Sequence, residues 1–191
     1  MLKEAVSGIA KKYGHSYFVK KAKSGQKPKE LWRELGENGF TGVNLPVEYG
    51  GGGMGITELA IAAKEVASVG CPLLMLVASP TICDTIIARF GTTQQKEKWL
   101  PRMASGEMMM SFAITEPDAG SNSHNISTKA TKDGDIFRLN GSKYFISGVD
   151  EAEAILVVAN TGVDENTGRG QLSLFIVDSD SKGLEKHLLP V

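Results

Sequence analysis

The spacing of apolar residues changes once along the chain, near residue 108, and that change limits the folds open to it. Over residues 28–104 apolar side chains recur at the spacing of helices with one buried face. Beyond residue 108, short apolar or alternating runs are separated by turn dipeptides, which is typical of hairpins. The sequence therefore predicts an α+β fold, with an N-terminal all-helical domain in residues 1–107 and a small antiparallel β-barrel domain in residues 108–191.

Local signals place the ends of the first predicted helices. We expect the helix around Leu31 to end near Gly39, because glycine readily adopts the left-handed conformation that follows a helix. Thr57 is expected to cap the next helix, which should run to about Val69. The lysine-rich N-terminus is interpreted as the solvated face of a helix.

The later part of the helical half contains two prolines that affect the prediction. Residues 73–90 form an apolar stretch too long for a strand, so we expect a buried helix that kinks or restarts at Pro80. Thr92 and Gln95 fit a capping box, which predicts a short helix that ends before Pro101.

The second half is expected to consist of short strands. Asp133-Gly134 and Asn140-Gly141 favour tight hairpin turns, and the polar segment 163–171 is expected to be an exposed hairpin connection. Several short strands at close spacing favour a barrel or a sandwich. The candidate strands are residues 110–115, 126–131, 136–139, 143–147, 155–159 and 172–177.

Composition and charge exclude several classes of function. The 21 basic and 22 acidic side chains leave a net charge of −1, which gives no field for attracting nucleic acid or an anionic membrane. Neither a membrane-spanning run nor a signal-peptide core is present, so we expect a soluble intracellular protein. Cys71 and Cys83 are expected to be buried free thiols, and the scattered histidines indicate no metal site.

Gly50, Gly52 and Gly55 match the GxGxxG spacing of dinucleotide-binding turns, but their context argues against that function. Such a turn follows a central parallel strand, and Pro46 removes a backbone donor from the segment where that strand should lie. A closely packed turn between helices is the better interpretation.

The segment best suited to bind a ligand is 112–121, where an apolar strand leads into a turn of small residues. Such a turn exposes backbone N–H groups. With the hydroxyls of Thr115 and Ser121 it could hold a polar ring edge and a pyrophosphate, because Gly120 removes side-chain obstruction. Spacing alone does not distinguish this site from an ordinary exit of a strand into a loop.

The segment 113–121 closely resembles the TEP-x-AGS signature of the acyl-CoA dehydrogenases. Further landmarks of that family occur in their usual order, and the resemblance covers roughly residues 30 to 190. They are Gly39-Phe40-Thr41-Gly42, Leu45-Pro46, Tyr49-Gly50-Gly51, Gly91-Thr92-Thr93-Gln94-Gln95-Lys96, Trp99-Leu100-Pro101, Ser105-Gly106-Glu107, Leu139-Asn140-Gly141-Ser142-Lys143 and Phe145-Ile146-Ser147.

The resemblance implies an FAD site whose first part lies in the signature. It places Phe112, Ile114 and Thr115 at the polar edge of the flavin, with Thr115 as the hydroxyl contact. It places Gly120 and Ser121 where the cofactor phosphates and the pantetheine arm of an acyl-CoA substrate pass, so that Ser121 contacts both.

The second part of the implied FAD site lies further along the chain. The resemblance implies that Phe145 packs against the flavin ring, that Ile146 supplies backbone contacts and that the Ser147 hydroxyl bonds near N5, the atom that receives hydride. Two residues depart from the usual pattern: Asn122 stands where the family has Asp, and Phe145 replaces a common Trp.

The resemblance also implies the reaction, which is α,β-dehydrogenation of an acyl-CoA thioester to a trans-2-enoyl-CoA, as in fatty acid β-oxidation. The family's catalytic carboxylate belongs to a C-terminal helical domain, which we expect to begin beyond Val191 because residues 188–191 resemble the end of the β-domain. We therefore assign no catalytic residue, and Glu116, in the turn signature, is not assigned as the base. Without that domain, apolar surface within residues 73–87 should be exposed.

The family further implies an electron-transfer flavoprotein as the electron acceptor and a homodimer or homotetramer as the full-length assembly. The expected location is the cytoplasm of a bacterium or the mitochondrial matrix of a eukaryote. Two alternatives stay open. A flavin oxidase or monooxygenase of the same fold would differ in its reactivity with oxygen, and a non-catalytic interaction protein would lack the base-bearing helix beyond Val191.

Overall fold

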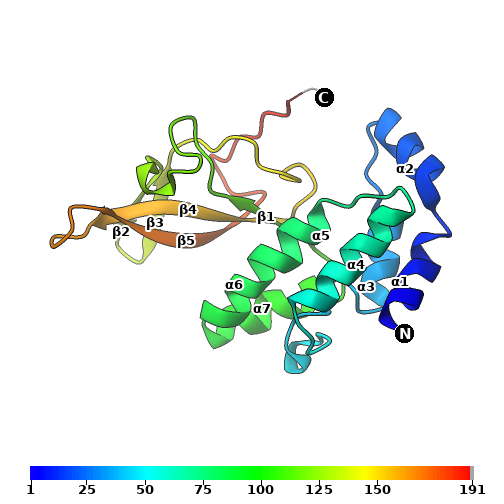
Figure 1. The fold of residues 1–191 in the computed structure, drawn as a ribbon. Coiled ribbons are helices and arrows are strands. Elements are labelled where there is room, and N and C mark those ends of the chain that lie inside the picture. The colour runs from blue at the N-terminus through cyan, green and yellow to red at the C-terminus, as the bar shows by residue number, and fades with distance from the viewer. Residues whose placement is uncertain (190–191) are drawn as a thin grey trace. The chain divides into compact units, whose positions relative to one another are not determined.

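The computed structural model describes residues 1–189, and it divides into two compact units, Met1–Met110 and a second that begins at Ser111. Helices make up the first unit and most of the strands lie in the second (Figure 1). The predicted α+β fold class is therefore confirmed. Residues 190 and 191, the end of the segment expected to close the β-domain, lie outside the described residues.

The first unit consists of helices of different lengths, and two of them, α1 and α2, precede the region where helical periodicity was noted. Three lysines of the N-terminus, Lys20, Lys21 and Lys23, lie on α2, whose residues are all at least partly exposed. The helices are α1 (Leu2–Ala10), α2 (Gly14–Lys23), α3 (Lys29–Glu37), η1 (Val47–Tyr49), α4 (Ile56–Ser68), α5 (Met75–Val77), η2 (Ala78–Asp84), α6 (Thr85–Phe90) and α7 (Thr93–Ala104).

Two of the predicted helix ends are confirmed. Helix α3 ends at Glu37, and Gly39 beyond it has the left-handed φ of 78°. At the start of α7, the Thr92 hydroxyl accepts the Gln95 N–H at 3.2 Å and the Gln95 side chain accepts the Thr92 N–H at 2.8 Å. This reciprocal pair is the capping box that the sequence predicted.

Two other predicted ends are wrong. Gly55, not Thr57, is the N-cap of α4, and its N–H donates to the Glu58 carboxylate at 2.9 Å. Helix α7 continues through Pro101 to Ala104. Although proline removes a helical hydrogen bond, the residues around it, including Leu100 and Met103, are buried. Their packing outweighs the lost bond.

The glycine-rich segment 50–55 is a packed turn between helices, as predicted. It follows the short helix η1 and not a strand. A Cβ atom placed on Gly51 would lie 2.5 Å from Cβ of Leu45, so only glycine fits there. Because a short helix and not a strand precedes these glycines, the GxGxxG spacing lacks the strand that a dinucleotide-binding turn requires.

Within the apolar stretch 73–90, residues 75–90 form one continuous helix whose middle is a π-helix, η2. Pro80 cannot donate to the carbonyl of Leu76, and the Thr81 hydroxyl lies 3.4 Å from that oxygen. The Pro80 carbonyl accepts the Asn44 side-chain amide at 3.0 Å. The predicted disturbance at Pro80 is therefore a widening of the helix, which is a known way of accommodating proline.

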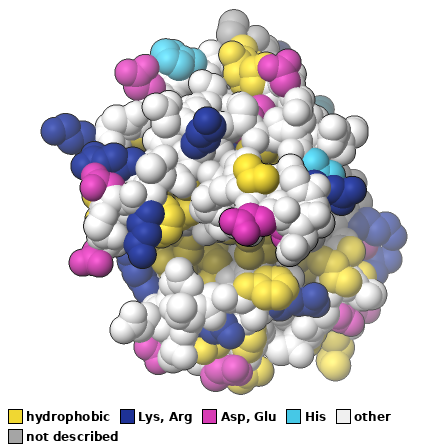
Figure 2. All heavy atoms as spheres, turned by 90° about the vertical axis from the view of Figure 1, so that its left-hand side faces the viewer, with side chains coloured by type: hydrophobic (Ala, Val, Ile, Leu, Met, Phe, Trp, Pro, Cys, Tyr) yellow, Lys and Arg dark blue, Asp and Glu magenta, His cyan; other side chains and the backbone are white. Residues whose placement is uncertain are grey.

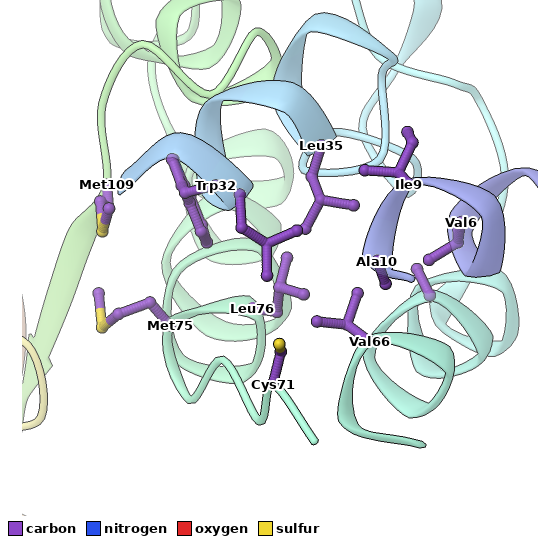
Figure 3. Packing of buried hydrophobic residues seen from close by; sticks show 12 residues of the cluster. Val6, Ile9, Ala10, Trp32, Leu35, Val66, Cys71, Met75, Leu76 and Met109 are labelled. Carbon is purple, nitrogen blue, oxygen red and sulfur yellow. The ribbon is translucent and has the colours of Figure 1, made fainter. Parts of the chain in front are cut away.

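The core of the first unit brings together side chains from α1, α3, α4 and α5, among them Trp32 and Leu35 (Figure 3). The Trp32 indole N–H is buried and donates to the Gly106 carbonyl at 3.0 Å. Cys71 and Cys83 are buried free thiols, as predicted.

Some side chains of the apolar stretch 73–90 are exposed within this unit. The exposed fractions of Leu74, Val77 and Phe90 are 60%, 48% and 78%.

The second unit contains a five-stranded sheet, to which β1 contributes from the junction of the units. The order is β1-β4-β2-β3, with β5 beside β4; β2 pairs antiparallel with β3, and β4 with β5. Lys129 and Asn160 join β2 and β4 in parallel, so the sheet is mixed and not wholly antiparallel. The strands are β1 (Met110–Ala113), β2 (Lys129–Asp133), β3 (Ile136–Asn140), β4 (Ala154–Val163) and β5 (Gly170–Asp178).

The predicted strand 143–147 is not a strand. Phe145 has a φ of 57°, which no regular strand residue adopts. The other predicted strands correspond to β1 to β5 with shifted ends. In the strand order of the described residues, β1 and β3 stand at opposite ends.

Neither positive nor negative side chains dominate the face drawn in Figure 2, where basic and acidic side chains are interspersed with hydrophobic ones. In the part of the chain that the structure describes, there is no helix long and apolar enough to cross a membrane. The same residues contain no cluster of His, Cys, Asp and Glu that could hold a metal ion.

Candidate functional site

Two short segments of the second unit, residues 111–116 and 143–147, lie side by side. The Tyr144 N–H donates to the Thr115 carbonyl at 2.9 Å, and the Ser111 hydroxyl donates to the Ser147 carbonyl at 2.9 Å. One bond joins each end, so the segments run in opposite directions. The structure thus brings the segment of Phe112, Ile114 and Thr115 next to that of Phe145, Ile146 and Ser147. Residues predicted to contact one flavin have to lie close together in this way.

Phe145 combines backbone strain with exposure. Within residues 1–189 it is the only residue other than glycine with a positive φ, and 76% of its surface is exposed. A bulky residue in this region costs about 1–3 kcal/mol, a kind of strain that clusters at functional sites. The neighbouring Tyr144 ring meets it edge to face, with centroids 6.2 Å apart. An exposed ring held in this way can stack on a planar ligand.

Glu116 anchors the turn that follows β1. Its side chain is buried, and its carboxylate accepts hydrogen bonds from the backbone N–H and hydroxyl groups of both Ser127 and Thr128. The Lys143 ammonium group lies 2.8 Å from Oε1 of the same carboxylate. Glu116 therefore holds three parts of the second unit together.

This environment keeps Glu116 ionised. Burial alone would raise the pKa of the carboxyl group, but hydrogen bonds from Lys143, Ser127 and Thr128 outweigh burial and hold the pKa well below its usual value. A carboxylate with so many donors is a poor proton acceptor. These contacts give Glu116 a structural part in the turn.

Gly120 and Ser121 lie on an exposed loop just after a tight turn. Glu116 and Ala119 exchange two backbone hydrogen bonds, of 3.0 and 3.2 Å, which close the turn. A Cβ atom on Gly120 would meet nothing within 4 Å, whereas one on Gly141 would lie 2.6 Å from Cα of Thr128. Packing within the chain therefore requires glycine at 141 but not at 120.

Sequence reasoning missed the residues that support this site. Ser111, Ser127 and Thr128 make the contacts described above, and Lys143 entered the sequence argument only as part of a motif. Lys143 and Glu116 are 27 positions apart. No local spacing signal reports a contact over that distance.

Comparison with known proteins finds one family at both units of the chain. Residues 1–107 match the family model "Acyl-CoA dehydrogenase, N-terminal domain", and residues 111–189 match "Acyl-CoA dehydrogenase, middle domain". The chain belongs to the acyl-CoA dehydrogenase family.

Curated relatives of the chain are about twice its length. It is 50% identical to an acyl-CoA dehydrogenase of Mycobacterium tuberculosis over 95% of its own residues and 47% of that protein. It is 37% identical to the mitochondrial isobutyryl-CoA dehydrogenase of Dictyostelium discoideum over 82% of its residues and 37% of that protein. The chain spans about half or less of each.

Solved acyl-CoA dehydrogenases share its fold. The enzyme from Geobacillus kaustophilus is 34% identical and superposes with a TM-score of 0.86 over 95% of this chain and 48% of the other. Butyryl-CoA dehydrogenase from Megasphaera elsdenii is 31% identical, with a TM-score of 0.81 over 95% of this chain and 49% of the other.

Glu116 is the acidic residue of the segment Thr115-Glu116-Pro117, which resembles the TEP signature of the family. In this chain that glutamate ties the signature to Ser127, Thr128 and Lys143. The signature's acidic residue thus has a clear structural role.

Proposed function

We propose that residues 1–191 form one wall of the FAD and substrate site of an enzyme that dehydrogenates an acyl-CoA thioester to a trans-2-enoyl-CoA. The observation that carries the proposal is the pairing of residues 111–116 with residues 143–147 through hydrogen bonds at both ends. This pairing supports the proposal because it brings together six of the residues expected to contact the flavin, which are Phe112, Ile114, Thr115, Phe145, Ile146 and Ser147.

The residues present fit FAD. The ring system needs an apolar face and a row of donors, and the paired segments offer the exposed Phe145 ring beside backbone groups and the hydroxyls of Thr115 and Ser147. A pyrophosphate needs donors without steric obstruction, and the loop at Gly120 and Ser121 is exposed and open.

In the proposed complex, each residue has a separate role. Phe112, Ile114 and Thr115 bind the polar edge of the flavin, Phe145 packs on the ring, Ile146 offers backbone contacts, and Ser147 donates near N5. Gly120 and Ser121 bind the phosphates, and Ser121 also contacts the pantetheine arm of the substrate. The bound FAD supplies the acceptor for the hydride that leaves the β-carbon.

The α-proton must leave through a different group. Glu116 is ionised but saturated with donors. We place the base on a further helical segment, corresponding to the half of the relatives that this chain does not match. An electron-transfer flavoprotein as acceptor, a homodimer or homotetramer, a role in fatty acid β-oxidation, and a cytoplasmic or mitochondrial location belong to the same proposal.

A flavin oxidase is the second candidate. A solved prolyl acyl carrier protein oxidase is 30% identical to this chain and superposes with a TM-score of 0.82 over 96% of it. Rapid reoxidation of the reduced flavin by oxygen would favour this candidate over a dehydrogenase.

Two measurements test the proposal. Absorbance after gel filtration should show FAD bound noncovalently to the full-length protein, but only weakly to residues 1–191, because the adenine half loses partners from the further segment. Residues 1–191 with added FAD should not reduce an artificial acceptor when acyl-CoA is supplied, and the full-length protein should. Absence of flavin from the full-length protein would refute the proposal, and turnover by residues 1–191 would refute the placement of the base.

A further inference from the structure

The Lys143 side chain makes a second contact besides its ion pair with Glu116. Its ammonium group donates to the Ile114 carbonyl at 3.0 Å as well as to the Glu116 carboxylate at 2.8 Å. We propose that Lys143 acts through the Ile114–Thr115 peptide to strengthen the Thr115 N–H as a hydrogen-bond donor to the flavin. Lys143 thereby favours reduction of bound FAD. This inference rests on the proposed function.

The ammonium group is held in one place. The Lys143 side chain is 10% exposed and that of Glu116 is 1% exposed, so water screens the pair little. The two acceptors belong to Ile114 and Glu116, which are two positions apart on the same short segment. The lysine is therefore directed at the backbone of the candidate site and not at solvent.

The peptide bond carries the effect from Lys143 to Thr115. In a trans peptide the C=O and the N–H point to opposite sides, so the Ile114 carbonyl faces Lys143 while the Thr115 N–H faces away from it. A hydrogen bond from a cation is roughly twice as strong as a neutral one. It pulls electron density toward the carbonyl oxygen, and the polarised N–H becomes a better donor.

The direction of the effect follows from charge. Reduction adds electron density to the ring, and a stronger donor at its polar edge stabilises that density more than it stabilises the oxidised ring. Removing the Lys143 charge should therefore lower the midpoint potential of bound FAD. A purely structural ion pair would change the stability of the fold and leave the potential unchanged.

Three variants separate these two roles in the flavin-loaded full-length protein. Lys143→Met removes the charge, Lys143→Arg keeps it, and Lys143→Met with Glu116→Gln removes both charges so that no buried carboxylate is left without its cation. Lys132→Met, at an exposed lysine of β2, is the control. The midpoint potential is measured by equilibration with a reference dye, and folding by circular dichroism and thermal unfolding.

We expect the ratio of reduced to oxidised flavin at a fixed ambient potential to fall roughly threefold to tenfold in Lys143→Met and in the double variant. A tenfold change corresponds to about 30 mV for a two-electron couple. Lys143→Arg should stay within about twofold of the wild type, and Lys132→Met should match it, since neither loses the buried charge.

Other outcomes are equally decisive. An unchanged potential in the double variant, with or without a lower unfolding temperature, overturns the inference. Folded but flavin-free Lys143→Met and double variants, beside a flavin-loaded Lys143→Arg, support it. If both neutral variants fail to fold, the role is structural and the inference fails. If the wild type itself binds no FAD, the proposed function fails instead.

Discussion

The hydroxyl of Ser111 donates to the backbone carbonyl of Ser147 at 2.9 Å, linking the start of the second unit to the end of the segment that carries Phe145. Ser111 is fully buried, which makes this bond a firm anchor. The bond uses the carbonyl of Ser147 and not its hydroxyl. The Ser147 side chain, on an exposed residue, can therefore serve a ligand while its backbone is held in position.

Replacing Ser147 with alanine tests that role. One hydrogen bond to a neutral group contributes about 0.5–1.5 kcal/mol, so Ser147→Ala should slow flavin reduction roughly threefold to tenfold in the full-length protein. Stopped-flow absorbance at saturating substrate measures the rate. Ser142→Ala changes an exposed serine of the same region and should have no effect. A wild-type rate in Ser147→Ala would remove Ser147 from the site.

The contrast between Gly120 and Gly141 gives a second prediction. Gly120→Ala should leave the free energy of unfolding nearly unchanged, because the added Cβ meets nothing within 4 Å, but it should weaken FAD binding if phosphates pass there. Gly141→Ala should destabilise the protein by about 1–3 kcal/mol, because its Cβ would lie 2.6 Å from Cα of Thr128. Urea unfolding and fluorescence titration with FAD measure the two effects. Equal FAD affinity of Gly120→Ala and the wild type would argue against a phosphate path beside Gly120.

Glu116 should make stability fall in acid. Its pKa in the folded protein is below the usual 4.5, so its contribution is present above about pH 4.5 and is lost as pH falls toward the folded value. Glu116→Gln should cost about 3–5 kcal/mol at pH 7, because Lys143 is left without its anion. This difference from the wild type should shrink between pH 4.5 and pH 3 in urea unfolding. Glu97→Gln, at an exposed carboxylate of α7, should cost less than about 0.5 kcal/mol, and a pH-independent cost of Glu116→Gln would contradict the prediction.

Asp84 should act in a different pH window and in the opposite sense. Burial raises its pKa from 3.8 to about 7, although the Ser79 hydroxyl at 3.3 Å opposes the shift. Between these values the unfolded chain ionises and the folded chain keeps its proton. Stability should therefore fall as pH rises, by at most about 1.4 kcal/mol per pH unit.

Asp84→Asn should remove this dependence. The variant should match the wild type near pH 4 and exceed its free energy of unfolding at pH 7, because the amide has no charge to release. Urea unfolding from pH 4 to pH 7.5 gives the comparison. Parallel curves for the two proteins would show that Asp84 titrates normally.

The helical half could be predicted where a local hydrogen bond decides the structure. The pair Thr92 and Gln95 satisfies both cap donors within four residues, so the sequence contains all the information needed. The prediction for Thr57 failed because the helix begins after Gly55, whose backbone N–H donates to the side chain of Glu58 in the first turn. The prediction for Pro101 failed because burial of the last turn of α7 depends on distant residues.

The candidate site could be predicted only in part for the same reason. The resemblance located the two segments, and their pairing follows from contacts over about 30 positions that no periodicity reveals. Phe145 was assigned to a strand because its neighbours are apolar, but its positive φ breaks the strand. The network of Glu116, Ser127, Thr128 and Lys143 became visible only in three dimensions.

The π-helix η2 restricts how this chain can evolve in length. A π-helix holds one more residue per turn than the α-helix on either side, and it lies directly before α6. Deleting one residue from Ala78–Asp84 would restore α-helical winding and leave the residues after it facing nearly the same way, so that Ile87 would stay buried. Deleting one residue from α6 would instead rotate everything after it by about 100°. Viable relatives should therefore differ in length within η2 and not within α6.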